Sequence, residues 1–219
     1  QMVGLSTTLM GETPVGGKFA SVTGPLGNPT HFGDARRVLC IGGGVGTAVL
    51  YPQVRYLAGE GIYVDVIEGA RTEELLVLQD ELGQLANHLY VATNDGSKGT
   101  KGFVTDVFNK LMAEGENYDL VIAIGPPIMM KVVAEATRPL VIRTLVSLNP
   151  IMVDGTGMCG GCRVSVGGKV KYACVDGPEF DGHEVDFDSL MRRLGAYKEQ
   201  EKRAMEDHKC RIGGIGHVN

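Results

Sequence analysis

The sequence has no excess of basic residues, and this absence narrows the partners that we expect. Lysine and arginine total 21 against 26 aspartate and glutamate residues, which gives a net charge of −5 at pH 7. Aromatic residues make up 6% of the chain, and neither a basic stripe nor an aromatic ladder is visible. Nucleic-acid binding depends on basic surfaces and stacking side chains. We therefore expect no nucleic-acid partner.

Long hydrophobic runs are also missing. The longest, Leu120–Met130, has eleven residues and is interrupted by Gly125, Pro126 and Pro127. A transmembrane helix needs about 20 consecutive apolar residues. No cleavable signal is visible at the N-terminus. The sequence therefore predicts no membrane association, and a cytoplasmic location is the simplest expectation.

Cysteine is scarce, and its distribution is uneven. Three of the five cysteines, Cys159, Cys162 and Cys174, fall in one glycine-rich stretch that Asp154 precedes. The odd number of cysteines and the missing signal disfavour a disulfide framework. Thiolates are soft ligands that hold iron–sulfur clusters or zinc. The spacing is that of a compressed plant-type [2Fe-2S] loop, with aspartate where a fourth cysteine is usual.

The glycines in this stretch favour a cluster over a single zinc ion. Gly160 and Gly161 let the backbone turn tightly and leave N–H groups that can point at sulfur. Zinc sites usually pair two short knuckles, with Cys or His as the fourth ligand. His183 lies nine residues beyond Cys174. We predict a [2Fe-2S] cluster, and a structural zinc site is the alternative.

The middle of the chain, residues 34–148, alternates strands with helices. This rhythm predicts the α/β class, with a doubly wound parallel sheet. We expect strands at residues 37–41, 62–67, 89–92, 120–124 and 141–145. We expect helices that end at Leu57, span residues 72–85 and 103–114, and begin near residue 129.

A glycine-rich turn follows the first of these strands and opens a helix. It contains Gly43, Gly44, Val45 and Gly46. Backbone N–H groups and the helix dipole favour an anion at such a place, which suits the pyrophosphate of a dinucleotide. The alternative is a tight strand-to-helix turn that needs small residues. The turn departs from G-x-G-x-x-G at its last position, so it is a moderate signal.

Further nucleotide contacts are expected at the carboxyl ends of the strands. Glu68, 22 residues after Gly46, suits the ribose 2′-hydroxyl of NAD, whereas Arg71 suits a 2′-phosphate. We predict NAD(H), with NADP(H) as the alternative. Other candidates at strand ends, each of which could instead be ordinary turn chemistry, are Asp95, Gly125, Pro126 and Met129.

Six short motifs occur in an order that resembles one family of electron-transfer proteins. They lie at residues 24–30, 41–46, 69–72, 95–105, 125–130 and 154–162. Together they closely resemble the small subunit of NADH-dependent reduced ferredoxin:NADP oxidoreductases, also described as ferredoxin–NADP reductase α subunits or sulfide dehydrogenase subunits. A more distant resemblance is to the electron-transfer subunit of dihydroorotate dehydrogenase, which has cysteine where this chain has Asp154. The resemblance covers nearly the whole chain.

The resemblance implies a ferredoxin-reductase-like module in four parts. These are the end of a truncated FAD-binding β-barrel (1–33), an NAD(P)-binding domain (34–148), a [2Fe-2S] domain (149–186), and a C-terminal helix and tail (187–219). The implied iron ligands are Asp154, Cys159, Cys162 and Cys174. Residues 1–33 would form barrel strands, except that Gly4, Ser6 and Thr7 would contact the flavin pyrophosphate at a short helix start.

The resemblance also implies the function. The chain would pass electrons between NAD(H), FAD and the cluster to a larger flavin/[4Fe-4S] subunit that bifurcates electrons and serves ferredoxin. A non-catalytic adaptor that binds a nucleotide and a structural zinc ion is the alternative. At the C-terminus, Asp186 or Asp188 is predicted to cap a helix. The polar run beyond Tyr197 either folds onto its own domain or docks on the larger subunit.

Overall fold

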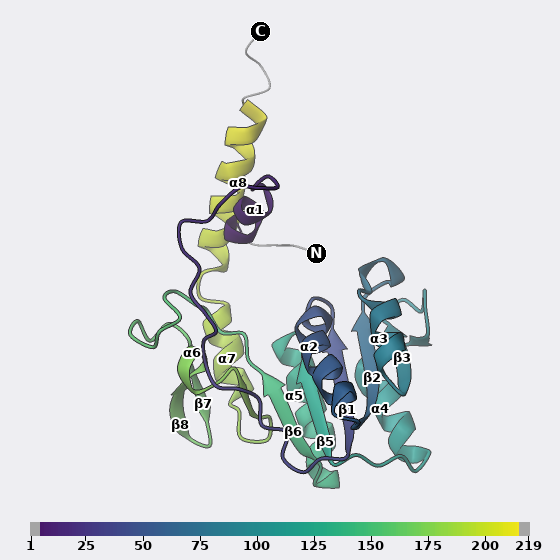
Figure 1. Ribbon diagram of the computed structural model, residues 1–219. Helices are drawn as coiled ribbons and strands as arrows, with labels where there is room; N and C mark the ends of the chain where they lie inside the picture. Colours follow the sequence, from purple (N-terminus) through teal and green to yellow (C-terminus); the bar gives the residue numbers. More distant parts are fainter. Residues whose placement is uncertain (1–4, 215–219) are drawn as a thin grey trace.

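The structure is a computed structural model that describes residues 5–214, and the side chains of residues 5–208. Its centre is a seven-stranded sheet in the order β4-β3-β2-β1-β5-β6-β9 (Figure 1). The first six strands are parallel, and β9 is antiparallel to β6. The strands are β1 (Arg37–Gly43), β2 (Tyr63–Ala70), β3 (His88–Thr93), β4 (Thr100–Lys101), β5 (Leu120–Ile124), β6 (Arg143–Ser147) and β9 (Glu179–Asp181).

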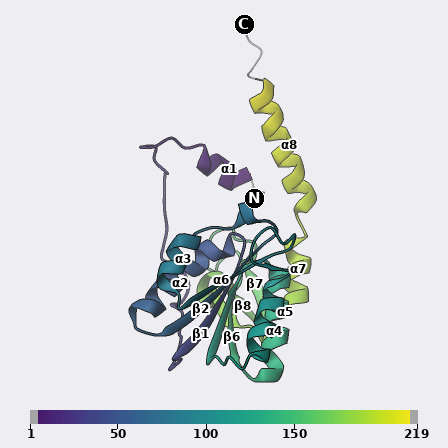
Figure 2. The same cartoon turned by 90° about the vertical axis from the view of Figure 1, so that its right-hand side faces the viewer.

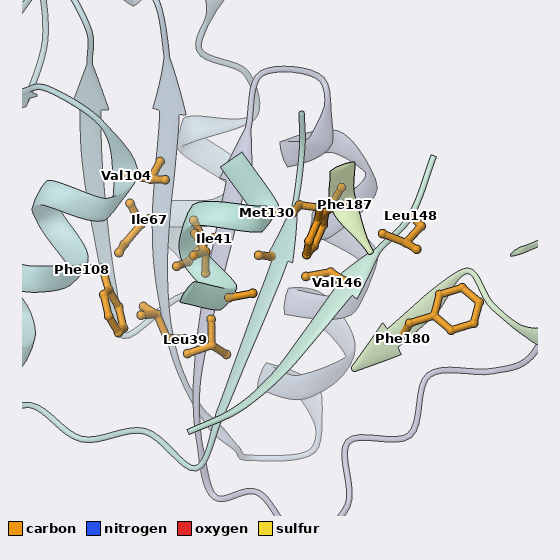
Figure 3. Close-up of a cluster of buried hydrophobic side chains, with 14 of the residues drawn as sticks. Leu39, Ile41, Ile67, Val104, Phe108, Met130, Val146, Leu148, Phe180 and Phe187 are labelled. Carbon is orange, nitrogen blue, oxygen red and sulfur yellow. The ribbon is translucent and has the colours of Figure 1, made fainter. Parts of the chain in front are cut away.

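Helices cover both faces of the sheet, which confirms the doubly wound prediction. Leu50 of α2 (Gly46–Gly59) and Leu82 of α3 (Gln79–Leu85) pack on one face. Phe108 of α4 (Val104–Ala113) and Met130 of α5 (Pro127–Thr137) pack on the other, against Leu39 of the sheet (Figure 3). Strand β5 is buried along its whole length because it is covered on both faces.

One predicted helix is shorter than expected. Residues 72–85 form a 3₁₀ turn, η1 (Glu73–Leu75), and then the separate helix α3. Between them the Val77 N–H donates to the Glu68 carboxylate at 2.7 Å, and Leu78 adopts a left-handed φ of 58°. A tertiary hydrogen bond therefore interrupts the helix that the apolar periodicity predicted.

The predicted cluster segment leaves the sheet after β6 and returns to it through β9. It carries a hairpin, β7 (Arg163–Val166) and β8 (Lys169–Tyr172), and a short helix, α6 (Ala173–Asp176). The Leu148 N–H donates to Pro178 O at 2.9 Å where the segment begins and ends. The loop is thus tethered at both ends to one edge of the sheet.

The C-terminal part is helical, as predicted. Asp186 caps α7 (Phe187–Leu194), because its side chain accepts a hydrogen bond from the Ser189 N–H at 2.9 Å. The polar run forms α8 (Lys198–Gly214), which projects away from the sheet (Figure 2).

The strands expected in residues 1–33 are a wrong prediction over the residues that the structure describes. Residues 5–36 contain one helix, α1 (Leu5–Gly11), followed by extended, largely exposed chain without a strand. Alternating residues become a strand only when a neighbouring strand accepts their hydrogen bonds. Here Asn28 bonds instead to the carbonyl groups of Gly177 and Val175. Helix α1 packs against α8 beyond the end of the sheet (Figure 1).

Candidate functional site

A cavity of about 630 Å³ lies at the carboxyl ends of the parallel strands. Its position follows from the topology, because the strand order reverses between β1 and β5 and leaves a crevice there. Apolar groups and backbone form most of the wall. The lining includes Gly43, Gly44, Arg71, Phe103, Pro126 and Met129.

The predicted nucleotide residues divide into two groups. Gly43, Gly44, Arg71, Pro126 and Met129 line the cavity, whereas Val45, Gly46, Glu68, Asp95 and Gly125 do not. Phe103 also lines it, although the sequence indicated only a helix start at that position. The motif at residues 101–105 contains Phe103, but nothing in the sequence predicted the short strand β4 that precedes it.

The glycine turn has the close packing expected of a tight strand-to-helix turn, which was the alternative to an anion site. A Cβ atom on Gly43 would lie 2.4 Å from Met129 Sδ, and one on Gly46 would lie 2.3 Å from Ile124 O. The contact at Gly46 is with backbone and therefore requires glycine on packing grounds alone. Gly44 has a φ of 55° and lines the cavity, and its N–H donates to Gly69 O at 2.9 Å.

Glu68 does not reach the cavity. Its side chain is 1% exposed and lies on the same sheet face as Val64 and Val66, which pack under α2 and α3. One carboxylate oxygen accepts from the Val77 N–H, and the other, Oε2, has no partner. Burial raises the pKa of Glu68 above its ordinary value. Strand alternation thus directs Glu68 away from the ribose position that the sequence predicted.

Asp95 shapes a turn beside the cavity. Its carboxylate accepts hydrogen bonds from the hydroxyl and the N–H of Ser97, at 2.7 and 3.0 Å, and these lower the pKa of Asp95. The Ser97 hydroxyl in turn accepts from the Glu73 N–H. Asn94, the residue before Asp95, lines the cavity. Asp95 therefore acts on the cavity through the turn that it holds.

The predicted iron ligands form two pairs. Asp154 accepts a hydrogen bond from the Cys159 N–H at 2.9 Å, and both residues are exposed. Hydrogen bonds from the backbone of Thr156 and Cys159 keep the pKa of Asp154 below its ordinary value. Cys162 and Cys174 are buried, and their sulfur atoms lie 3.2 Å apart.

This arrangement fits a two-iron cluster better than one zinc ion. Across residues 5–208, no three histidine, cysteine, aspartate or glutamate side chains converge on a single point. Tetrahedral zinc needs four ligands on one ion, whereas each iron of a [2Fe-2S] cluster takes two protein ligands. The donor chemistry and the pairing of Asp154 with Cys159, and of Cys162 with Cys174, both suit the cluster.

Exposed apolar side chains stand next to three of the predicted iron ligands in the sequence. Met158 is 87% exposed directly before Cys159, and Val153 is 76% exposed directly before Asp154. Met152 and Val175 are exposed nearby in the sequence of the same segment. Exposed apolar groups that gather at one place mark surfaces for other proteins.

The predicted flavin residues lie apart from the cavity at the strand ends (Figure 1). Ser6 and Thr7 are exposed on α1, which packs against α8 (Figure 1). Gly4 lies outside the described residues. The structure therefore does not bring these residues together with the cavity or the cluster loop.

Two family models match the two regions that contain the cavity and the predicted iron ligands. Residues 40–135 match the oxidoreductase NAD-binding domain, and residues 149–186 match the iron-sulfur cluster binding domain of dihydroorotate dehydrogenase B. A homologue of the dihydroorotate dehydrogenase B electron transfer subunit from Thermotoga maritima is 48% identical over 94% of this chain and 72% of its own length. The chain belongs to this family of electron transfer subunits.

Two further matches extend the likeness. An uncharacterised Clostridium beijerinckii protein encoded in the adh 3′ region is 48% identical over 99% of this chain and 77% of its own length. A structure of NADH-dependent reduced ferredoxin-NADP oxidoreductase, solved to study flavin-based electron bifurcation, matches with a TM-score of 0.86. It is 46% identical and covers 95% of this chain and 75% of that one.

Membership in this family confirms the predicted resemblance, the ferredoxin-reductase-like fold and the electron-transfer function. The protein is an electron-transfer subunit of an oxidoreductase, with an NAD-binding and an iron–sulfur-binding domain. Because its relatives are subunits, a partner subunit is implied. Within the described residues, no helix is long and apolar enough to span a membrane.

Proposed function

We propose that this chain is the NAD(H)-dependent electron-transfer subunit of a bifurcating ferredoxin:NADP oxidoreductase. The observation that carries the proposal is the pairing of Asp154 with Cys159 and of Cys162 with Cys174. The loop that holds these pairs is tethered to the edge of an NAD-binding sheet. The likeness to the NADH-dependent reduced ferredoxin-NADP oxidoreductase structure supports the reaction.

The cavity at the strand ends would bind the dinucleotide. We expect the backbone of Gly43 and Gly44 to approach the pyrophosphate, close to the N-terminus of α2. Pro126 and Met129 would hold the nicotinamide side of the cavity, and Arg71 would meet the adenosine side. Because Glu68 is buried away from the cavity, it would not select NAD(H) through the ribose hydroxyl.

The cluster loop would hold two irons with one ligand pair each. The carboxylate of Asp154 is a harder ligand than a thiolate, so it would alter the reduction potential of its iron. When bound, flavin supplies the conversion of a hydride into single electrons, and the cluster passes these electrons on one at a time. We propose that Gly4, Ser6 and Thr7 contact the flavin pyrophosphate.

The larger flavin/[4Fe-4S] subunit would dock over the exposed half of the cluster loop. Met158 and Val153 stand beside Asp154 and Cys159, which gives that subunit an apolar contact near the electron exit. Ferredoxin would then be an indirect partner. The exposed polar surface of α8 supports docking of the C-terminal tail on the same subunit.

Visible and EPR spectra of anaerobically purified protein, before and after dithionite, test this function. We expect red-brown protein that gives a rhombic S = ½ signal on reduction, and a changed signal in Asp154→Cys. The same sample, titrated with NADH and NADPH, should be reduced by NADH when flavin is present. Colourless protein with stoichiometric zinc would instead support the adaptor function.

A further inference from the structure

Two arginine side chains hold the linker that follows Cys159 in the cluster loop. This linker consists of Gly160 and Gly161. Arg163 Nη1 donates to Gly160 O, and Arg193 Nη2 donates to Gly161 O, both at 3.1 Å. Each carbonyl group of the linker therefore has a guanidinium partner.

The first of these contacts leads directly to a ligand sulfur. The peptide that joins Gly160 to Gly161 accepts from Arg163 at its oxygen and donates from its N–H to Cys159 Sγ at 3.3 Å. A peptide whose oxygen accepts a charge-assisted hydrogen bond is polarised and donates more strongly at its N–H. Hydrogen bonds to ligand sulfur raise the reduction potential of a cluster, because they stabilise the extra negative charge.

The second arginine is placed by the sheet domain. Arg193 is half-buried on α7, whose residue Asp188 forms a 2.8 Å ion pair with Lys131 of α5. Arginine keeps its charge at all ordinary pH values, and a half-buried charge is poorly screened by salt. A fixed positive charge thus lies against the loop, and the framework around the nucleotide cavity holds it there.

We propose that Arg163 and Arg193 are positioning residues that raise the potential of the cluster and keep its loop in shape. The inference rests on the proposed function, since it needs a cluster in the loop. Reduction adds one negative charge, which nearby guanidinium groups stabilise. In cluster-free protein, the same hydrogen bonds hold the linker and leave the Gly161 N–H directed at Cys159.

Redox titration followed by EPR tests the charge effect on the full chain. We expect Arg193→Met to lower the midpoint potential by on the order of 59 mV, which is a tenfold change in a one-electron equilibrium. Arg192→Met is the matched control, because Arg192 is exposed one residue earlier on the same helix. It should shift the potential much less, and Arg193→Lys should stay nearer to the wild type than Arg193→Met.

Equal potentials for wild type and Arg193→Met, or equal shifts for Arg192→Met and Arg193→Met, would overturn the proposal. If Arg193→Met takes up no cluster, Arg163→Met supplies the same measurement, since the Arg163 side chain is exposed. If wild-type protein takes up no cluster, the proposed function fails separately. Amide hydrogen exchange in cluster-free protein then tests whether Arg193 holds the loop in shape. Arg193→Met should speed exchange at residues 159–162 more than Arg192→Met does.

Discussion

Glycine has different roles in the turn at residues 43–46 and in the loop that carries the predicted iron ligands. In the nucleotide turn, Gly46 is buried, and a Cβ there would lie 2.3 Å from Ile124 O. In the cluster loop, Gly160 has a φ of 66°, and a Cβ there would meet nothing closer than 3.8 Å. Gly46 is therefore needed for close packing, whereas Gly160 is needed for backbone conformation. The nucleotide turn is therefore shaped by the core, whereas the cluster loop is shaped by its own polar contacts.

This difference implies that disruption of one site should leave the other site folded. The nucleotide cavity forms with the sheet, because Gly43 packs against Met129 and Pro126. The cluster loop depends on hydrogen bonds to exposed groups such as Asp154, and a bound metal would supply the rest of its order. Loss of the cluster should leave the sheet folded.

The largest expected effect is the loss of the cluster in Cys159→Ala. An exposed ligand is removed, so the visible absorbance of the cluster should vanish, while the free energy of unfolding of cluster-free protein should change by less than about 0.5 kcal/mol. Cys40→Ala is the control, because Cys40 is a buried cysteine of strand β1 that lies outside the cluster loop. It should keep the cluster and lose about 1 kcal/mol of stability. If both variants behaved alike, the sites would not be independent.

Replacing single glycines with alanine should separate the free-energy cost of close packing from that of a left-handed backbone conformation. Gly46→Ala should cost about 1–3 kcal/mol, because the backbone around Ile124 O cannot yield freely. Gly160→Ala should cost about 1–2 kcal/mol through its left-handed φ. Gly59, in the same helix as Gly46, has open space, so Gly59→Ala should stabilise by about 0.5 kcal/mol. Urea unfolding measures all three, and a tolerated Gly46→Ala would contradict the packing argument.

The smallest expected effect depends on pH. Burial raises the pKa of Glu68 above its ordinary 4.5 in the folded protein, so its contribution to stability is present below that pH. The contribution is lost as the pH rises through the raised value. Glu68→Gln should therefore be more stable than wild type at pH 8, and this advantage should shrink towards pH 4.

Glu74→Gln is the control for this pH dependence, because Glu74 is exposed in the neighbouring turn. Thermal unfolding of both variants across this pH range checks the prediction. A Glu68→Gln advantage that stays constant with pH would show that the Glu68 carboxylate does not titrate differently on folding.

Much of the sheet domain could be predicted from local patterns. Each strand predicted in residues 34–148 is present. Continuous apolar runs such as Leu120–Ile124 predict buried parallel strands well, because such strands are covered on both faces. A helix cap at Asp186 or Asp188 was also predicted, since capping depends only on nearby residues, and the structure has Asp186 in this role. The strands expected in residues 1–33 were mispredicted over the described residues, because strand formation depends on a neighbouring strand that local alternation cannot report, whereas the short helix start was correct, since α1 begins at Leu5.

The sequence by itself determined which residues are the candidates for the chemistry: the glycine turn at the end of the first strand, and one aspartate and three cysteines in a glycine-rich loop. These follow from residue type and spacing, which are local properties. Only the tertiary structure decided that Glu68 faces away from the cavity, that Cys162 lies against Cys174, and that Arg193 reaches Gly161. Strand alternation, loop closure and helix packing set these contacts, and they join residues far apart in the chain.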